Sequence, residues 1–293
     1  MSSFDFETTT HGKWILAGEH AVLRGHGALV FPIASKKIIF RYSSASSSLS
    51  ADFEGKHGET LHLLFWSVLE HGLRLLNRTL NQITGSFYIS NSIQIGVGMG
   101  ASAALCVAVT RWFIYQGWLT AQHEFTFAKS LEDLFHGKSS GLDIVGVSAQ
   151  SGMFFQQGTA QPVLQKWQPK WCLSFSGQQG LTSPCIAKVN SLWENNPALA
   201  AAIDERMEKS VNMAQQSLAD STLAAKLLLA ESMEIALSCF QDWKLISETM
   251  LAHVDSLKKL GAIAIKPTGS GGGGYVLSLW HEYPLQSDNM LMV

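Results

Sequence analysis

The chain reads Gly96-Val97-Gly98-Met99-Gly100-Ala101-Ser102-Ala103-Ala104 where a short predicted strand is followed by a helix. The alternation in Ser86-Phe87-Tyr88-Ile89-Ser90 predicts the strand, and the apolar run from Ala101 to Tyr115 predicts the helix. Glycines permit the dihedral angles and the close approach that a backbone needs around an anion. A glycine loop that opens into a helix N-terminus is therefore a candidate phosphate-binding loop.

Other interpretations of this loop compete with that one. The chain has no G-x-x-x-x-G-K-[ST] pattern here, which excludes a P-loop. Gly96, Gly98 and Ala101 approximate the dinucleotide fingerprint G-x-G-x-x-A, but no acidic residue ends a strand about 20 residues further on. A helix cap with flexible glycines fits the segment, taken alone, about as well as a phosphate loop does.

A second glycine-rich segment lies near the C-terminus and reads Lys266-Pro267-Thr268-Gly269-Ser270-Gly271-Gly272-Gly273-Gly274. Such a composition is ordinarily that of a flexible linker. This run, however, leads directly into the apolar strand predicted at Tyr275-Val276-Leu277-Ser278-Leu279, and it does not separate regions of different composition. We therefore expect a loop that belongs to a folded domain.

Together with Gly12-Lys13-Trp14-Ile15-Leu16-Ala17-Gly18-Glu19-His20, these segments resemble, in order, the three motifs of the GHMP small-molecule kinases. The first is most similar to that of the mevalonate kinases. The second is similar to G-L-G-S-S-A-A, with Ala101 in place of the first serine and Gln94 near the usual proline. The third is similar to K-x-T-G-A-G-G-G-G and is the most specific of the three.

A fourth segment, His136-Gly137-Lys138-Ser139-Ser140-Gly141-Leu142-Asp143, resembles H-G-N-P-S-G-V-D of the mevalonate kinases. The resemblance implies that Asp143 is the catalytic base and that Lys13 lies close to it. It also implies that Glu132, eleven residues before Asp143, binds Mg²⁺ together with Ser102. If the register slips by one residue, Asp133 is the alternative ligand.

The same resemblance assigns the remaining site residues. ATP would be bound by the second motif, through Gly96, Gly98, Met99, Gly100, Ala101, Ser102 and Ala103. The alcohol would contact Glu19, His20, Gly271, Gly272 and, on a looser match, Thr182.

The order of predicted elements favours an α+β fold, because strands and helices do not alternate regularly. Strands are expected at Ala28–Phe31 and Lys37–Tyr42, separated by Pro32, and the serine-rich run 43–50 is expected to be a mobile surface loop. The segment from Pro197 to Phe240 is expected to form two helices. The resemblance implies a ribosomal-protein-S5-like N-terminal domain, residues 1–160, and a ferredoxin-like C-terminal domain, residues 161–293, with the active site in the cleft.

The composition limits which binding partners and which cellular location we expect. The chain has 293 residues, 46% of them hydrophobic, and a net charge of −2, so neither nucleic acid nor an anionic membrane is an expected partner. The four cysteines are scattered, which predicts reduced, buried thiols. The first residues lack the basic and apolar regions of a secretory signal, and a cytoplasmic location is expected. Mevalonate kinases are often dimers, so a homodimer is one assembly to test.

The resemblance implies that the chain transfers the γ-phosphoryl group of ATP to the 5-hydroxyl of mevalonate or of a similar alcohol. Ser139 and Ile144 depart from the mevalonate kinase pattern, where proline and asparagine are usual. The alternatives are another GHMP kinase, acting on phosphomevalonate or a sugar, and a non-catalytic sensor with the same fold. A diphosphomevalonate decarboxylase is disfavoured by the first motif.

Overall fold

The computed structural model describes residues 4–55, 57–137, 139–180, 182–284 and 289–293. It divides into two compact units of interleaved sequence. Unit 1 comprises Met1–Lys13, Pro32–Ile95 and Met99–Gln150, and unit 2 comprises Trp14–Phe31, Gly96–Gly98 and Ser151–Val293. Lys138 of the fourth segment and the first three residues lie outside the described residues. The predicted boundary near residue 160 stays a prediction.

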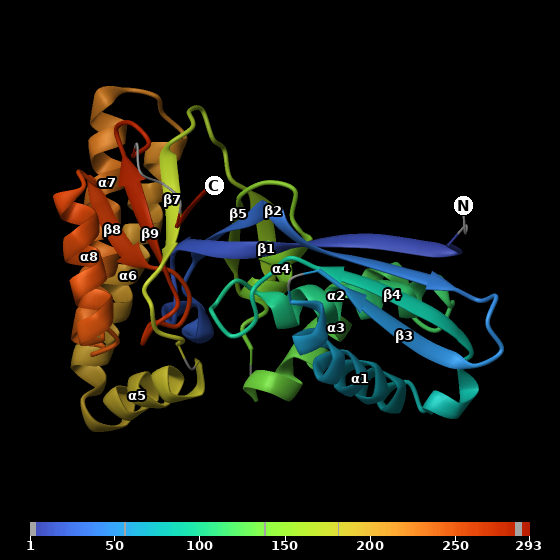
Figure 1. Ribbon diagram of the computed structural model, residues 1–293. Coiled ribbons are helices and arrows are strands. Elements are labelled where there is room, and N and C mark those ends of the chain that lie inside the picture. The colour runs from blue at the N-terminus through green and yellow to red at the C-terminus, as the bar shows by residue number, and fades with distance from the viewer. Residues whose placement is uncertain (1–3, 56, 138, 181, 285–288) are drawn as a thin grey trace. The chain divides into compact units, whose positions relative to one another are not determined.

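Among the residues that the structure describes, unit 1 combines part of a β-sheet with four α-helices (Figure 1). Its strands are β3 (Leu49–Glu54), β4 (Gly85–Asn91) and parts of β1 (Phe6–Ala17) and β2 (Ala28–Ser43), which both continue into unit 2. β4 pairs in parallel with β3 and antiparallel with β2, and β1 also pairs with β2. The helices are α1 (Gly58–Leu75), α2 (Ala101–Tyr115), α3 (Glu124–His136) and α4 (Leu142–Ser148).

Helix α2 has the bounds that the apolar run predicts, and it is buried on almost every side. A helix that is apolar all round must be enclosed by other elements, and α1, α3 and α4 all pack against it. Aromatic rings of Phe40, Phe87 and Trp112 meet at this sheet–helix interface, with centroids 5.5 Å apart for the first pair and 4.9 Å for the second. The first turn of α2 is thereby fixed on a rigid core.

Unit 2 contains a four-stranded antiparallel sheet of order β10-β7-β9-β8. Its strands are β7 (Lys170–Phe175), β8 (Ala264–Pro267), β9 (Tyr275–Trp280) and β10 (Met290–Met292). Numbered within this sheet, the order is 4-1-3-2, the order expected of a ferredoxin-like domain. The α+β prediction is thus confirmed in both units.

Four helices of unit 2 lie in sequence between β7 and β8: α5 (Thr182–Asn195), α6 (Pro197–Leu218), α7 (Leu223–Asp242) and α8 (Glu248–Lys259). Helices α6, α7 and α8 stand along one face of the sheet in Figure 1. Met250, Val254 and Leu257 of α8 pack against Ile265 and Val276 of the strands. These apolar residues recur every three or four positions, so they form one helical stripe that faces the sheet.

A hairpin of β5 (Met153–Gln156) and β6 (Thr159–Pro162) completes unit 2, with β5 paired to Ala28–Val30 of β2. The predicted break at Pro32 was wrong, because β2 is continuous. Pro32 lies between the residues that pair with β5 and those that pair with β4, so its missing N–H interrupts neither of those ladders. The serine-rich run was also not all loop, since the end of β2 and the start of β3 lie within it.

The four cysteines are buried and form no disulfide, as predicted. None of the helices in the described part of the chain has the length and apolar character needed to cross a bilayer.

Candidate functional site

Lys13 and Asp143 form an ion pair in unit 1, with Lys13 Nζ 2.8 Å from Asp143 Oδ1. Lys13 lies on β1, and its backbone N–H donates to Met99 O at 2.9 Å, which ties the strand to the loop before α2. Asp143 lies in the first turn of α4, after Gly141, whose φ of +88° turns the chain into the helix. The lysine side chain is 2% exposed and the aspartate 31%, so the carboxylate is accessible while the ammonium is not.

Glu132 is the second acid of this group and lies on α3, buried. Burial and the neighbouring charge of Asp143 raise the pKa of Glu132, while the Ser139 hydroxyl and Lys13 oppose that rise. A carboxyl group that is costly to ionise in the absence of another cation would become easier to ionise beside one. Asp133, the alternative metal ligand, is engaged elsewhere, since it accepts from Lys129 Nζ at 3.2 Å and from the Ser139 N–H at 2.6 Å.

Ser102 lies in the first turn of α2, between the buried Ala101 and Ala103. The first helical hydrogen bond runs from the Ala104 N–H to Gly100 O at 2.9 Å. The N–H groups of the three preceding residues therefore have no acceptor within the helix. Such a helix end attracts anions, and Ser102 adds a hydroxyl to it.

The glycine loop before α2 takes positive φ at each glycine: +77° at Gly96, +83° at Gly98 and +78° at Gly100. Residues other than glycine rarely adopt this backbone conformation. A Cβ atom on Gly100 would also lie 2.8 Å from Lys13 Cγ and 3.0 Å from Val147 Cγ1, whereas one on Gly96 would meet nothing within 4 Å. Gly100 is therefore needed both for the turn and for the room beside Lys13.

The first and third motifs meet within unit 2. Lys266 Nζ donates to Glu19 Oε1 at 2.5 Å, to Ile15 O at 3.2 Å and to Pro267 O at 2.5 Å. Thr268 Oγ1 accepts from the Ile15 N–H at 2.8 Å and lies 3.1 Å from Ile15 O. The end of β1 is thus fixed to the start of the third loop.

His20 makes another link between these motifs, with Nε2 2.9 Å from Ser270 O. Its backbone has a φ of +60°, which is strained for a residue with a side chain. The imidazole contacts the rings of Phe240 and Trp243. Desolvation lowers the pKa of His20 to about 4, while the hydrogen bond to Ser270 opposes that change. The ring is therefore neutral at pH 7.

The other residues expected near the substrate lie on the third loop and on α5. The Thr182 hydroxyl, at the start of α5, is 3.4 Å from the Ser270 hydroxyl. Gly271 and Gly272 have φ of +80° and +72°. A Cβ atom on Gly272 would lie 2.8 Å from Cys185 Sγ, so α5 packs closely against this loop.

Sequence reasoning did not assign roles to Lys266, Thr268 or Ser270, although all three lie in the third motif. For Lys266 and Thr268 the spacing of two residues at the end of a strand was the available signal, because alternate residues of a strand face the same side. Ser270 contacts His20 through its backbone carbonyl, which no side-chain pattern predicts. Arg24 and Asp204 were also missed. Arg24 binds the carboxylate through two nitrogens, with Nη2 2.7 Å from Oδ1, and this pair supports the helical turn Ala21–Arg24 that follows His20.

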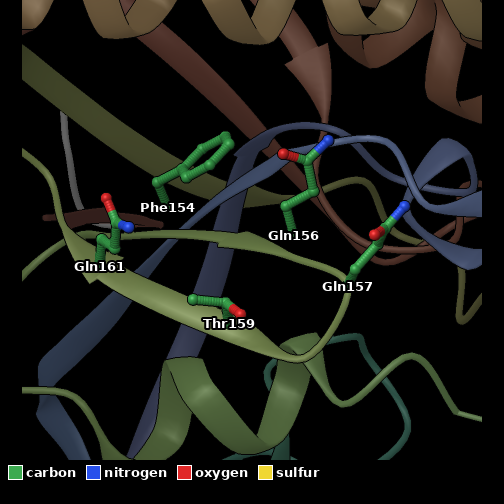
Figure 2. Close-up of a pocket in the computed structure, with 5 residues that line it drawn as sticks. All are labelled: Phe154, Gln156, Gln157, Thr159 and Gln161. Atoms are coloured by element: carbon green, nitrogen blue, oxygen red, sulfur yellow. The ribbon is translucent and has the colours of Figure 1, made fainter.

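A surface pocket in unit 2 has a different character (Figure 2). Phe154, Gln156, Gln157, Thr159 and Gln161 line it along the β5–β6 hairpin. These side chains are neutral, so they offer neither a cation for phosphate nor a carboxylate for a proton. Among the residues that the structure describes, no group of three or more His, Cys, Asp or Glu residues could hold a metal ion.

Comparison with known proteins finds relatives of this chain. A family profile described as the GHMP kinases N terminal domain matches residues 64–151, which include the glycine loop, Glu132 and Asp143. The mevalonate kinase of Pyrococcus abyssi is 26% identical over 91% of this chain and 86% of its own. That of Thermococcus sibiricus is 27% identical over 92% and 87%.

The chain therefore resembles the GHMP kinases, through a profile match over residues 64–151 and through relatives of 26–27% identity. Its fold matches that of the L. major mevalonate kinase solved in complex with R-mevalonate, with a TM-score of 0.78 over 100% of this chain and 98% of that one. The two sequences are 19% identical, so this likeness is one of fold. The chain thus shares that fold over its whole length, whereas its activity and its particular alcohol have to be argued from its own residues.

Proposed function

We propose that this protein is a GHMP kinase that transfers the γ-phosphoryl group of ATP to the 5-hydroxyl group of mevalonate. The observation that carries the proposal is the Lys13–Asp143 pair, in which a buried ammonium lies 2.8 Å from an accessible carboxylate. Phosphoryl transfer needs positioning and charge neutralisation more than covalent help from the protein. A general base beside a fixed cation, in the same unit as a helix N-terminus, fits that requirement.

Each residue has a definite task in this proposal. Asp143 accepts the proton of the attacking hydroxyl as the new O–P bond forms and the bond between the β- and γ-phosphates breaks. Lys13 stabilises the carboxylate and the negative charge that develops on the alcohol oxygen. The first turn of α2 and Ser102 bind phosphate oxygens, because their N–H and O–H groups are donors without helical acceptors.

The residues present also fit Mg²⁺. This ion prefers one or two protein oxygens, with phosphate and water oxygens completing its shell. Glu132 offers a buried carboxylate whose raised pKa would fall beside a cation, and Ser102 offers a hydroxyl. Mg²⁺ held there would neutralise charge on the phosphates.

The choice of mevalonate rests on sequence likeness. Gly18-Glu19-His20 and the segment that ends in Asp143 resemble the mevalonate kinases, and the curated relatives compared above carry that name. Phosphomevalonate and sugars are the competing substrates, since one fold serves several alcohols.

The test is ADP release with ATP–Mg²⁺ and each of mevalonate, phosphomevalonate, galactose and homoserine. Turnover with mevalonate alone, lost in Asp143→Asn and retained in Asp242→Asn, is the expected result. Asp242 is a suitable control because it forms an exposed ion pair with Arg206 in unit 2. Turnover with another alcohol would reject the substrate but keep the mechanism. ATP binding without turnover on any alcohol would favour a sensor.

A further inference from the structure

The buried contact between Glu19 and Lys266 concerns two residues that look like ligand contacts in the sequence. Glu19 is part of the Gly18-Glu19-His20 segment, which the family resemblance places against the substrate. Lys266 stands just before a glycine loop, where a lysine would be expected to reach a phosphate. The structure buries both side chains: that of Lys266 is fully buried, and that of Glu19 is 2% exposed.

The ammonium of Lys266 has three N–H donors, and the structure gives it three acceptors: Glu19 Oε1, Ile15 O and Pro267 O. Contact with a phosphate would require one of these hydrogen bonds to break inside the protein. The Lys266 ring contact is also internal, since Nζ lies 5.5 Å from the centroid of Phe240. The arrangement is that of a lysine that holds protein groups in place.

Lys266, Thr268 and Ser270, at alternate positions of the third motif, all bind residues of the first motif. Lys266 binds Ile15 and Glu19, Thr268 binds Ile15, and the carbonyl of Ser270 accepts from His20. Because side chains two residues apart face one side of a strand, Lys266 and Thr268 reach the end of β1 together. His20, whose backbone is strained, directly follows Glu19 in the chain. A strained conformation persists only when the surrounding structure fixes it, and the ion pair of Glu19 with Lys266 is placed to do so.

We infer that Glu19 and Lys266 are positioning residues, which act as one neutral ion pair to hold the His20 turn and the third glycine loop in place. In this interpretation Glu19 serves the substrate through His20 and not by direct contact. The inference rests on the proposed function for its catalytic consequence. Its structural part, the placement of His20 against the third glycine loop, can be measured without any substrate.

The experiment compares Glu19→Gln, Lys266→Met and the double variant Glu19→Gln/Lys266→Met. Lys266→Met leaves a buried carboxylate without its cation, whereas the double variant removes both charges. We expect Lys266→Met to lower kcat/KM for mevalonate by roughly 10- to 100-fold, and the double variant to recover about 10-fold of that loss. Lys170→Met is the control, because Lys170 pairs with Glu282 at an exposed position of the same unit.

A direct substrate contact would give another pattern. Glu19→Gln would then raise the KM for mevalonate at unchanged kcat, and Lys266→Met would have little effect of its own. A double variant no more active than Glu19→Gln, with the whole loss in the KM for mevalonate, would overturn the inference.

The second readout is the imidazole NMR signal of His20 in protein labelled with ¹⁵N-histidine, recorded without ligand. A carbonyl only accepts, so Nε2 must carry the proton in the hydrogen bond to Ser270. We expect this signal to shift in Lys266→Met and to return towards its original position in the double variant. An unchanged signal in Lys266→Met would overturn the inference, even if no alcohol were turned over and the proposed function had failed.

Should Lys266→Met not fold, the folding of the double variant replaces both readouts. The double variant is expected to show a cooperative thermal unfolding transition, because it buries no unpaired charge. A double variant that also fails to fold would contradict the pairing.

Discussion

Lys13 and Asp143 are joined by an ion pair that exposes only one of its partners. The ammonium is enclosed by β1 and the loop before α2, while the carboxylate on α4 is open. A buried charge loses its hydration and is stable only beside a partner. The lysine is therefore held facing the carboxylate, and the carboxylate keeps a free side for a second group.

Replacing the cation should slow turnover without abolishing the fold. We expect Lys13→Met to lower kcat by about 10²- to 10³-fold, as for other groups that stabilise charge in a transition state. Single-turnover measurements with ATP–Mg²⁺ would test this. Lys129→Met is the matched control, because Lys129 forms a partly exposed i,i+4 pair with Asp133, which contributes little to stability. An equal loss in both variants would contradict the assignment.

The glycine loop offers a comparison of two substitutions with the same backbone cost. Gly96→Ala and Gly100→Ala both place a side chain at positive φ, at a cost of about 1–2 kcal/mol. Only the second adds a Cβ atom within 3.0 Å of Lys13 and Val147. We expect Gly100→Ala to be the less stable variant in chemical denaturation and to lose more kcat.

If both alanine variants behaved alike, the close approach of Gly100 to Lys13 would have no energetic consequence. The comparison needs no separate control, because Gly96→Ala already accounts for the strain of the turn.

Glu132 should be an acid that reduces stability in the absence of a metal. Its pKa is raised from the usual 4.5 to about 8, mainly by desolvation. Between that value and the raised one, the folded state binds more protons than the unfolded state, so stability falls as the pH rises. Glu132→Gln removes the ionisation. We expect its melting temperature to exceed that of the wild type at pH 8 by more than at pH 5, both measured without Mg²⁺.

Added Mg²⁺ and nucleotide should reverse that order, because they would stabilise the protein that still has its carboxylate. A glutamine variant stabilised equally by Mg²⁺ and nucleotide would show that Glu132 is not a ligand.

His20 should give the opposite dependence on pH. Burial lowers its pKa from 6.5 to about 4, so between these values the unfolded state binds more protons and stability falls as the pH falls. His20→Gln should flatten the curve of unfolding free energy over this range. The difference amounts to at most about 3 kcal/mol. Urea denaturation at pH 7, 5.5 and 4.5 would measure it, and parallel curves for the two proteins would contradict the burial argument.

The sequence predicted local structure well where a pattern repeated. The apolar run gave α2 with its correct bounds, and the glycine segments were located without the structure. The Lys13–Asp143 pair could be expected only from family resemblance, because 130 residues separate the partners and no periodicity links them. The Lys266–Glu19 pair spans 247 residues and was missed for the same reason. Pro32 was wrongly predicted to end a strand. Proline lacks a backbone N–H, but the sequence does not reveal whether a neighbouring strand needs that N–H as a hydrogen-bond donor.

Elements with weak local signals were also missed. Helix α5 begins at Thr182 after a glycine-rich turn, and its apolar residues are few. Its position depends on packing against the third loop, through Cys185 and Gly272, and not on its own composition. Whether the assigned residues bind substrate and nucleotide remains a prediction.

The interleaving of the two units limits how this chain can be cut or recombined. Trp14 stacks on Phe31 with ring centroids 4.6 Å apart, and both rings meet Trp171. All three belong to unit 2, although the first two are separated from the third by most of unit 1 in the sequence. A gene fragment that ended between the units would therefore leave unit 2 without part of its core. Chimaeras with related kinases should keep Trp14–Phe31 and the C-terminal half from one parent, so exchange at a single crossover point would be poorly tolerated.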